Sequence, residues 1–211
     1  MRDISRVQQL DALPRLLSAA AQSSAQLFNV SNLAAPFQAQ RVTIRNYITL
    51  LEQIFLLDLL PPWHSNRLRR LIKTPKLHMG DTGLACAMMG VSADGLKKER
   101  ALFGRLVETF VYQEVNRQAG AHEATFRFYH FRDKDRAEVD IVIERGAHEI
   151  AGIEVKAGAT VRSKDFRGLR KLQSGGGNRF VCGVVLYDGE TSVRFGDNLF
   201  ALPIRSLWEK F

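Results

Sequence analysis

The stretch "EVDIVIERGAHEIAGIEVKAG", from Glu138 to Gly158, predicts two β-strands joined by a tight turn. Apolar residues alternate with other residues on both sides of "RGAH", and a repeat of two is typical of strands. With a turn centred on Ala147, Glu144 faces Ile150 and Asp140 faces Glu154 across an antiparallel hairpin. The second half of the chain is therefore expected to form around this hairpin.

The hairpin carries carboxylates at positions where an ordinary core would have apolar side chains. Alternation sorts the residues into a core face with Val139, Ile141, Ile143, Ile153 and Val155, and an opposite face with Asp140, Glu154 and Lys156. Two carboxylates that face each other on neighbouring strands repel and lower stability. A divalent cation relieves this repulsion because it binds carboxylate oxygens. The pattern therefore indicates a metal site.

A helix upstream supplies a third carboxylate. "KKERALFGRLVETFVYQEVNRQAG", Lys97 to Gly120, predicts a helix of about six turns in which Glu108 lies among apolar residues. An acidic residue on such a face needs a partner. We expect Glu108, Asp140 and Glu154 to bind Mg²⁺ or Mn²⁺, and Lys156 to orient water beside the catalytic residues Asp140 and Glu154, as phosphodiester hydrolysis requires. The alternative is a structural ion-pair network of the same four residues, with Glu138 facing Lys156.

The first half has the pattern of a helix-turn-helix. A short helix that ends before Pro36 precedes a longer helix from about Val42 to Leu56, and Arg41 and Arg45 lie at its N-terminal end. The longer helix is expected to bury one apolar face, made by Ile44, Tyr47, Ile48, Leu51, Ile54 and Phe55. Residues 55–63 and 75–81 then predict two strands around a basic loop. This loop contributes four further candidates for phosphate contact: Arg67, Arg69, Arg70 and Lys73. The alternative is a solvated basic loop in a helical domain.

Charge and composition fit this division. The chain has 211 residues, a net charge of +8 and 45% hydrophobic residues. Residues 1–100 hold 13 Lys and Arg against 7 Asp and Glu, whereas residues 101–211 hold 17 against 15. The basic excess therefore lies mainly in the first half, which favours DNA as a partner. We place the domain boundary in a turn-rich stretch, giving a helical domain over 1–92 and an α/β domain over 93–211.

Several other classes of protein are not favoured. The sequence has neither an apolar run of about 18 residues nor a signal-peptide pattern, so we expect a cytoplasmic protein without a membrane span. Cys86 and Cys182 are expected to be reduced thiols in apolar surroundings. The histidines show no metal-ligand spacing, and no catalytic Ser–His pairing is evident.

Motifs in order along the chain resemble a known family. They are "RVTIRNYITLLEQIFLLDLLPPWHSNRLRRLIKTPKLHMGDTGLA", "LFGRLVETFVYQEV", "AEVDIVIE", "GIEVKAGATVRSKDFRGLRKL" and "VVLYDGE". Together they resemble the C-terminal region, a domain of unknown function, of prokaryotic AAA-type ATPases. The resemblance implies a winged helix followed by a PD-(D/E)XK (restriction-endonuclease-like) α/β domain, an α+β chain with a mixed sheet flanked by helices. It places Asp140, Glu154 and Lys156 on the nuclease-like motif and Glu108 on its helix acid.

The resemblance also implies an ATPase domain upstream. This chain lacks the G-x-x-x-x-G-K-[ST] phosphate-binding loop, so ATP is expected to bind only through such an additional domain, and no ATPase activity is expected from the chain alone. Two functions stay open at this point. The chain is either a DNA-associated protein with a metal-dependent nuclease-like domain, or a non-catalytic module that binds DNA or a protein partner through an inactive nuclease-like fold. The intact acidic set favours metal binding.

Overall fold

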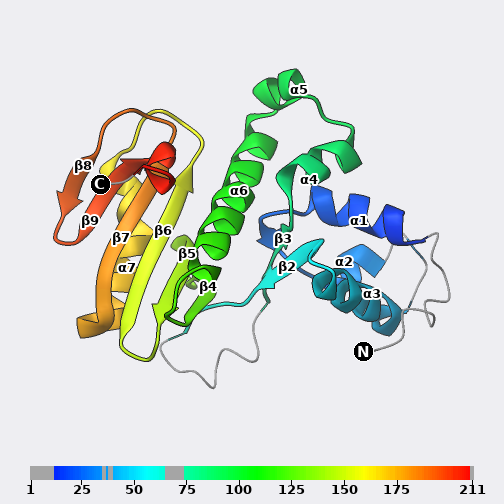
Figure 1. Cartoon of the computed structure of the whole chain (residues 1–211), viewed down its shortest axis with the longest axis horizontal. Helices are drawn as coiled ribbons and strands as arrows, with labels where there is room; N and C mark the ends of the chain where they lie inside the picture. Colours follow the sequence, from blue (N-terminus) through cyan, green and yellow to red (C-terminus); the bar gives the residue numbers. More distant parts are fainter. Residues whose placement is uncertain (1–11, 35–36, 38–39, 65–73, 210–211) are drawn as a thin grey trace.

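The computed structural model of the chain describes residues 12–34, 37, 40–64 and 74–209. It is a mixed α and β protein with a small and a large sheet (Figure 1). The first half contains α1 (Ala12–Gln22), β1 (Gln26–Leu27), α2 (Val30–Ala34), α3 (Arg41–Gln53), β2 (Leu57–Leu60), β3 (Lys76–Met79) and α4 (Thr82–Met89). None of the described helices is long and apolar enough to cross a membrane.

The small sheet has the order β1-β3-β2, with both strand pairs antiparallel. It packs with the helices of the first half around a core that includes Leu16, Ile48 and Leu77. The apolar face predicted for α3 is confirmed at Ile44, Tyr47, Ile48 and Leu51, which are buried. It is wrong at Ile54 and Phe55, because the helix ends at Gln53 and Phe55 is 85% exposed with a φ of 59°.

The second half contains α5 (Ala93–Lys98), α6 (Arg100–Gly120), β4 (Phe126–Arg132), β5 (Glu138–Arg145), β6 (Glu149–Lys156), η4 (Ser163–Phe166), α7 (Arg167–Gly176), η5 (Gly177–Arg179), β7 (Phe180–Tyr187), β8 (Val193–Gly196), β9 (Leu199–Pro203) and η6 (Ile204–Leu207). The single helix predicted from Lys97 is therefore two helices that meet at Glu99. The strands form one mixed sheet of order β4-β5-β6-β7-β9-β8. Of its pairs, β6–β7 and β7–β9 are parallel and the others antiparallel.

Helices cover both faces of the large sheet (Figure 1). One face packs with α7 and η4 around Val142, Phe166 and Leu169. The opposite face packs with α6 around Val111 and Ile141. The hairpin is therefore buried on both faces, as a strand with apolar residues at successive positions requires.

Helix α6 connects the two halves of the molecule. Leu102 and Leu106, in its first two turns, belong to the core of the first half, whereas Val111 and Tyr112 pack on the large sheet. A second connection is made after β2, where Pro62 and His130 form an isolated parallel bridge. The predicted boundary after residue 92 lies between α4 and α5, and the first-half core reaches beyond it into α6.

Candidate functional site

A β-bulge in β5 sets the position of Asp140. Tyr129 pairs with Val142 and Phe131 pairs with Val139, so Asp140 and Ile141 together oppose His130. Such a bulge re-aims side chains and often lies beside a functional site. It also corrects the predicted core face, because Val139 packs in the cluster beneath α7 while Ile141 packs beneath α6.

The predicted register of the hairpin is confirmed from Arg145↔Glu149 through Ile141↔Ile153. The regular ladder ends there, one residue before the predicted pair of Asp140 and Glu154. Beyond that point, the Asp140 carboxylate accepts a hydrogen bond from the Val155 backbone N–H, with 2.9 Å between Oδ2 and N. Asp140 is thus fixed against β6 at the end of the hairpin, and its side chain is buried.

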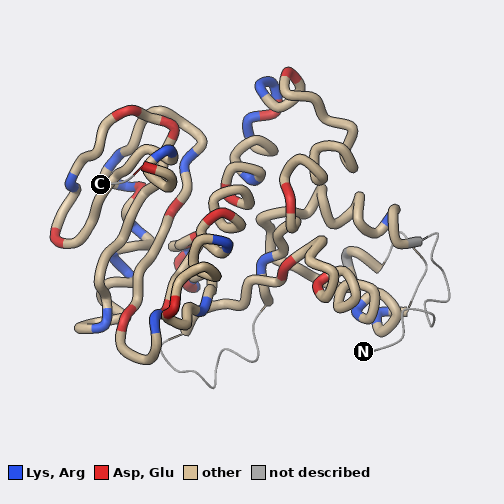
Figure 2. The backbone as a smooth tube through the Cα atoms, in the orientation of Figure 1, with Lys and Arg blue, Asp and Glu red and all other residues tan. Residues whose placement is uncertain are grey.

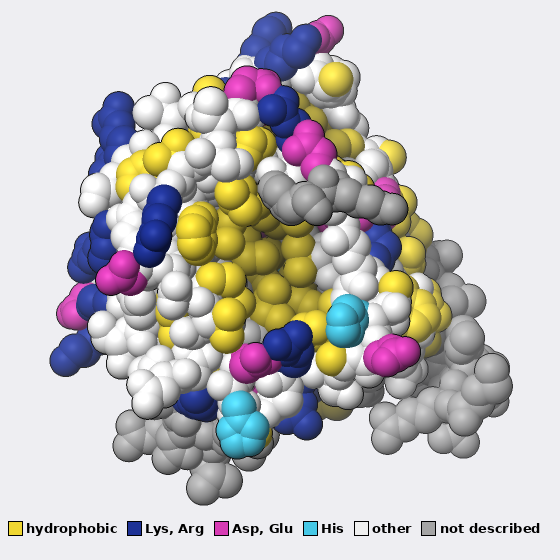
Figure 3. Space-filling model, turned by 60° about the vertical axis from the view of Figure 1, so that its left-hand side comes forward, with side chains coloured by type: hydrophobic (Ala, Val, Ile, Leu, Met, Phe, Trp, Pro, Cys, Tyr) yellow, Lys and Arg dark blue, Asp and Glu magenta, His cyan; other side chains and the backbone are white. Residues whose placement is uncertain are grey.

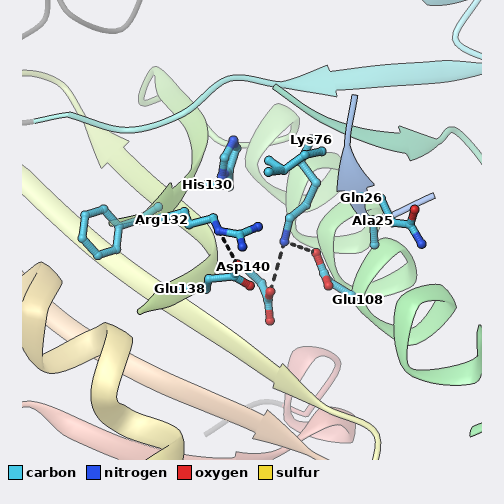
Figure 4. Close-up of a pocket in the computed structure, with 10 residues that line it drawn as sticks. Ala25, Gln26, Lys76, Glu108, His130, Arg132, Glu138 and Asp140 are labelled. Carbon is cyan, nitrogen blue, oxygen red and sulfur yellow. Dashed lines mark hydrogen bonds and ion pairs between the residues drawn. The ribbon is translucent and has the colours of Figure 1, made fainter. Parts of the chain in front are cut away.

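Lys76, at the start of β3, connects Asp140 to Glu108. Its ammonium Nζ lies 2.6 Å from Glu108 Oε1 and 3.2 Å from Asp140 Oδ1 (Figure 4). The lysine is only 8% exposed. Burial opposes its charge, but the carboxylates of Asp140 and Glu108 outweigh burial and raise the pKa of Lys76 above its ordinary value. Lys76 is therefore a permanent cation at this site.

The two glutamates of the predicted set have perturbed acidities. Burial and the nearby charge of Asp140 raise the pKa of Glu108 to about 8, although Lys76 acts in the opposite direction. The same two causes raise the pKa of Glu154 to about 8, against the effect of Lys156. Carboxyl groups with raised pKa values are common in catalytic sites, and they also occur in structural ion-pair networks.

Glu154 and Lys156 form a second ion pair on β6. Their Nζ and Oε1 atoms are 2.6 Å apart. The flanking residues Ile153 and Val155 pack beneath α6, so strand alternation directs Glu154 and Lys156 toward the α7 side. Among the described residues, none hydrogen-bonds to the buried Oε2 of Glu154. An unsatisfied buried carboxylate oxygen calls for an explanation, such as an ion or a water molecule.

A polar cavity of about 350 Å³ opens beside the first ion pair. Residues from both halves line it (Figure 4). They are Ala25, Gln26, Leu27, Lys76, Glu108, His130, Phe131, Arg132, Glu138 and Asp140. Glu138 pairs with Arg132 across the β4–β5 ladder, with 2.8 Å between Oε1 of Glu138 and Nε of Arg132. The ion-pair alternative had instead predicted that Glu138 faces Lys156. Glu154 and Lys156 are outside this lining.

The structure thus divides the predicted acidic set into two neighbouring pairs. Glu108 and Asp140 meet at the cavity through Lys76, and Glu154 with Lys156 lies on the adjoining strand end. In the part of the chain that the structure describes, no three His, Cys, Asp or Glu side chains are grouped closely enough to hold a metal ion. The donor chemistry of the three carboxylates and the unsatisfied Glu154 Oε2 suit a hard divalent cation. Lys76 is the feature that stands against it.

Sequence reasoning missed Lys76 because its partners lie 32 and 64 residues away. A signal was nevertheless present. In "PKLHM", strand alternation places Lys76 and His78 on the same side of an otherwise apolar strand. Both are buried in the structure, and His78 Nδ1 lies 3.0 Å from Thr109 Oγ1 of α6. Two buried polar side chains from one strand indicate a polar contact with another element.

The predicted nucleic-acid residues are only partly placed. Arg41 and Arg45 are exposed at the N-terminal end of α3. Arg67, Arg69, Arg70 and Lys73 lie outside the described residues. Lys and Arg occur on both halves of the molecule, including α3 and α5 (Figure 2). The exposed position of Arg41 and Arg45 leaves both guanidinium groups accessible to a phosphate backbone.

Comparison with known proteins adds two family matches. Residues 103–207 match a family model described as "Domain of unknown function (DUF4143)", and residues 1–95 match "Domain of unknown function (DUF8612)". Each half thus matches a domain of unknown function. The domain matched by the second half is commonly found in AAA-ATPase-associated proteins.

Two curated mycobacterial proteins are similar to the chain. They are "Uncharacterized protein Rv2008c" of Mycobacterium tuberculosis and "Uncharacterized protein Mb2031c" of Mycobacterium bovis. Each is 29% identical over 181 residues, which cover 84% of this chain and 38% of the relative. The chain therefore spans well under half the length of these relatives.

Proposed function

We propose that the chain is the DNA-associated, cytoplasmic portion of an AAA-type ATPase family protein, with a winged-helix half and a PD-(D/E)XK nuclease-like half. Its acidic centre would bind Mg²⁺ or Mn²⁺ and support phosphodiester cleavage. The observation that carries this proposal is the position of the buried Asp140 at the end of the β5–β6 hairpin, between the Lys76–Glu108 pair and the Glu154–Lys156 pair. Any ATP binding would belong to an additional domain.

The order of elements supports the two-part fold. A helix, a short strand, two helices and an antiparallel strand pair follow one another in the first half, as a winged helix would require. In the second half, α6, the meander β4–β6, α7 and the parallel strand β7 follow the helix–three strands–helix–strand order expected of the nuclease-like domain. Asp140 lies near the start of β5 and Glu154 near the end of β6.

The residues of the chain would have separate roles at the centre. The carboxylates of Glu108, Asp140 and Glu154 would hold the cation, with the Val155 N–H orienting Asp140 from behind. Lys156, held by Glu154, would position a water molecule for attack. A bound divalent cation supplies charge stabilisation on the phosphate and lowers the pKa of water. Arg41 and Arg45 would contact phosphates away from the centre.

Cleavage of DNA in the presence of Mg²⁺ or Mn²⁺ tests the proposal. We expect Glu154→Gln to lower the cleavage rate roughly 100-fold, since even the loss of a group that supports a metal ligand costs 10- to 100-fold. Glu149→Gln is the matched control, because Glu149 lies on the same strand in an exposed pair with Arg145. Unchanged cleavage in Glu154→Gln would contradict the assignment of this centre.

A non-catalytic module is the second candidate, and the position of Lys76 favours it. An ammonium that already pairs with both Glu108 and Asp140 reduces the need for a metal ion to stabilise this arrangement. This candidate predicts binding of DNA without cleavage in either metal. The affinity should fall steeply as salt is raised, and Arg41→Ala together with Arg45→Ala should reduce the salt dependence by about two phosphate contacts.

A further inference from the structure

We infer that the ammonium of Lys76 competes with a divalent metal ion for the carboxylates of Glu108 and Asp140. Through this lysine, the first half of the chain lowers the affinity of the acidic centre in the second half for a metal ion. The inference rests on the proposed function, because it assumes that the centre can accept a metal. It adds a residue outside the nuclease-like motif and assigns it control over the metal site.

The contacts of Lys76 are those of a built site. Only 8% of Lys76 is exposed, and its ammonium contacts two carboxylates whose side chains are themselves nearly buried. A buried ammonium is costly unless its partners have good geometry, and removing one partner of such a group is strongly destabilising. The 2.6 Å contact to Glu108 and the 3.2 Å contact to Asp140 meet this requirement. Lys76 therefore supplies the positive charge that these two carboxylates would otherwise take from a bound cation.

The backbone around Lys76 explains why its position is fixed. It lies at the start of β3, in the middle of the small sheet, where it pairs with Leu27 of β1 and with Leu60 of β2. Two residues further on, His78 contacts Thr109, the residue next to Glu108 on α6. Thr109 also meets Ser24, whose hydroxyl accepts the Met79 backbone N–H. These contacts hold β3 against α6, so Lys76 can leave the carboxylates only if its side chain swings away or the small sheet shifts.

The chain has a second lysine that bridges two carboxylates, which gives a matched comparison. Lys171 of α7 contacts Asp133 and Asp135, but its side chain is 36% exposed, as against 10% for Lys76. An exposed carboxylate pair is screened by water and holds a cation weakly. A buried pair is screened far less, so the loss of its lysine leaves a strong demand for another cation.

Binding of Mn²⁺, measured by calorimetry on the full chain, tests the inference. In Lys76→Met the two carboxylates lose their lysine partner, so Mn²⁺ no longer has to break the hydrogen bonds of the ammonium. Each such charged hydrogen bond is worth about tenfold in affinity, and we therefore expect the affinity for Mn²⁺ to rise roughly tenfold or more. Lys171→Met should leave the affinity unchanged. Lys76→Arg keeps the charge and should keep the affinity close to that of the wild type. Adding Glu108→Gln to Lys76→Met should remove the gain.

A measurement on the wild-type chain avoids dependence on the folding of the variants. An amine-reactive acylating reagent, read by peptide mass spectrometry, reports how accessible each lysine is. We expect saturating Mn²⁺ to raise the labelling rate of Lys76 roughly tenfold, as a displaced ammonium becomes exposed, while Lys171 stays constant. Equal affinity for Mn²⁺ in the wild type and Lys76→Met, or bound Mn²⁺ with unchanged labelling of Lys76, would overturn the inference and leave the proposed metal site standing. An absence of Mn²⁺ binding in the wild type and in Lys76→Met alike would overturn both.

Discussion

The two faces of the large sheet differ in how completely they are filled. Beneath α7, Phe166, Leu169 and Leu172 are fully buried, and the glycines Gly152 and Gly168 leave no room for a side chain. Beneath α6, several apolar residues such as Val184 and Leu202 are only partly buried. Figure 3 shows hydrophobic side chains gathered in a hollow on one face of the molecule.

The two faces of the large sheet also differ in their polar groups. The side of the sheet that meets α6 also carries the contacts of Lys76, Glu108 and Asp140 and the buried pair of His78 and Thr109. The α7 side is a close-packed layer that fixes the sheet, whereas the α6 side joins the two halves and holds Glu108 and Asp140 of the candidate centre. A tightly packed face tolerates little change in volume. The α6 face should therefore tolerate apolar substitutions better than the α7 face.

The largest difference is expected for a phenylalanine on each side. Phe166→Ala should lower the free energy of unfolding by about 4 kcal/mol, because it removes a fully buried ring. Phe128→Ala, in the cluster beneath α6, should lower it by about 2 kcal/mol, because Phe128 is only partly buried. Urea unfolding of the two variants measures both values. Equal losses would show that the two faces are packed alike.

Glycines give the next largest contrast. A Cβ at Gly168 would lie 1.7 Å from the Glu138 carbonyl oxygen, so Gly168→Ala should destabilise the chain by about 3 kcal/mol through displacement of α7 from β5. A Cβ at Gly104 on α6 would meet no atom within 4 Å. Gly104→Ala should therefore stabilise the chain by about 1 kcal/mol, since alanine favours a helix. Thermal unfolding of the two variants measures both effects. A Gly168→Ala protein that unfolds at the same temperature as the wild type would contradict the close approach of α7 to β5.

The smallest effect concerns pH on the polar side. Burial and the positive charge of Lys76 lower the pKa of His130 to about 4, whereas an unfolded histidine has a pKa of about 6.5. Between these values the unfolded chain binds a proton that the folded chain does not, so stability falls as pH falls. This histidine alone should account for about 2 kcal/mol between pH 7 and pH 5.

His130→Gln is the test of this pH dependence. Glutamine lacks the titrating ring, and its amide can donate to the Thr74 carbonyl that His130 Nε2 contacts. The variant should lose less stability than the wild type when denaturant unfolding is compared at pH 7 and pH 5. Identical losses in the two proteins would mean that His130 has the same pKa in the folded and the unfolded chain.

Local patterns predicted much of the fold. Alternation gave the register of the hairpin, and apolar spacing gave the buried face of α3 through Leu51. The end of α3 was missed because the apolar spacing continues into Ile54 and Phe55, which leave the helix and face solvent. The bulge at Asp140 and Ile141 was also missed, because strand alternation alone does not contain an extra residue.

The candidate site was predicted as a set of residues but not as an arrangement. Glu108 and Asp140 meet at one cavity, as the buried acid on the helix suggested. Their partner Lys76 comes from the other half of the chain, and nothing in the spacing of the nuclease-like motif refers to it. Long-range pairing of this kind depends on how two halves dock, which no single stretch of sequence determines.

The position of α6 has a consequence for separating the two halves of the chain. The family match of the first half ends at residue 95, and that of the second half begins at residue 103. Leu102 and Leu106 nevertheless belong to the core of the first half. A gene fusion that moved only the second half to another protein would expose these leucines, and the first half left behind would lose two core side chains. The two halves are therefore expected to unfold together, because the core of the first half includes side chains of α6.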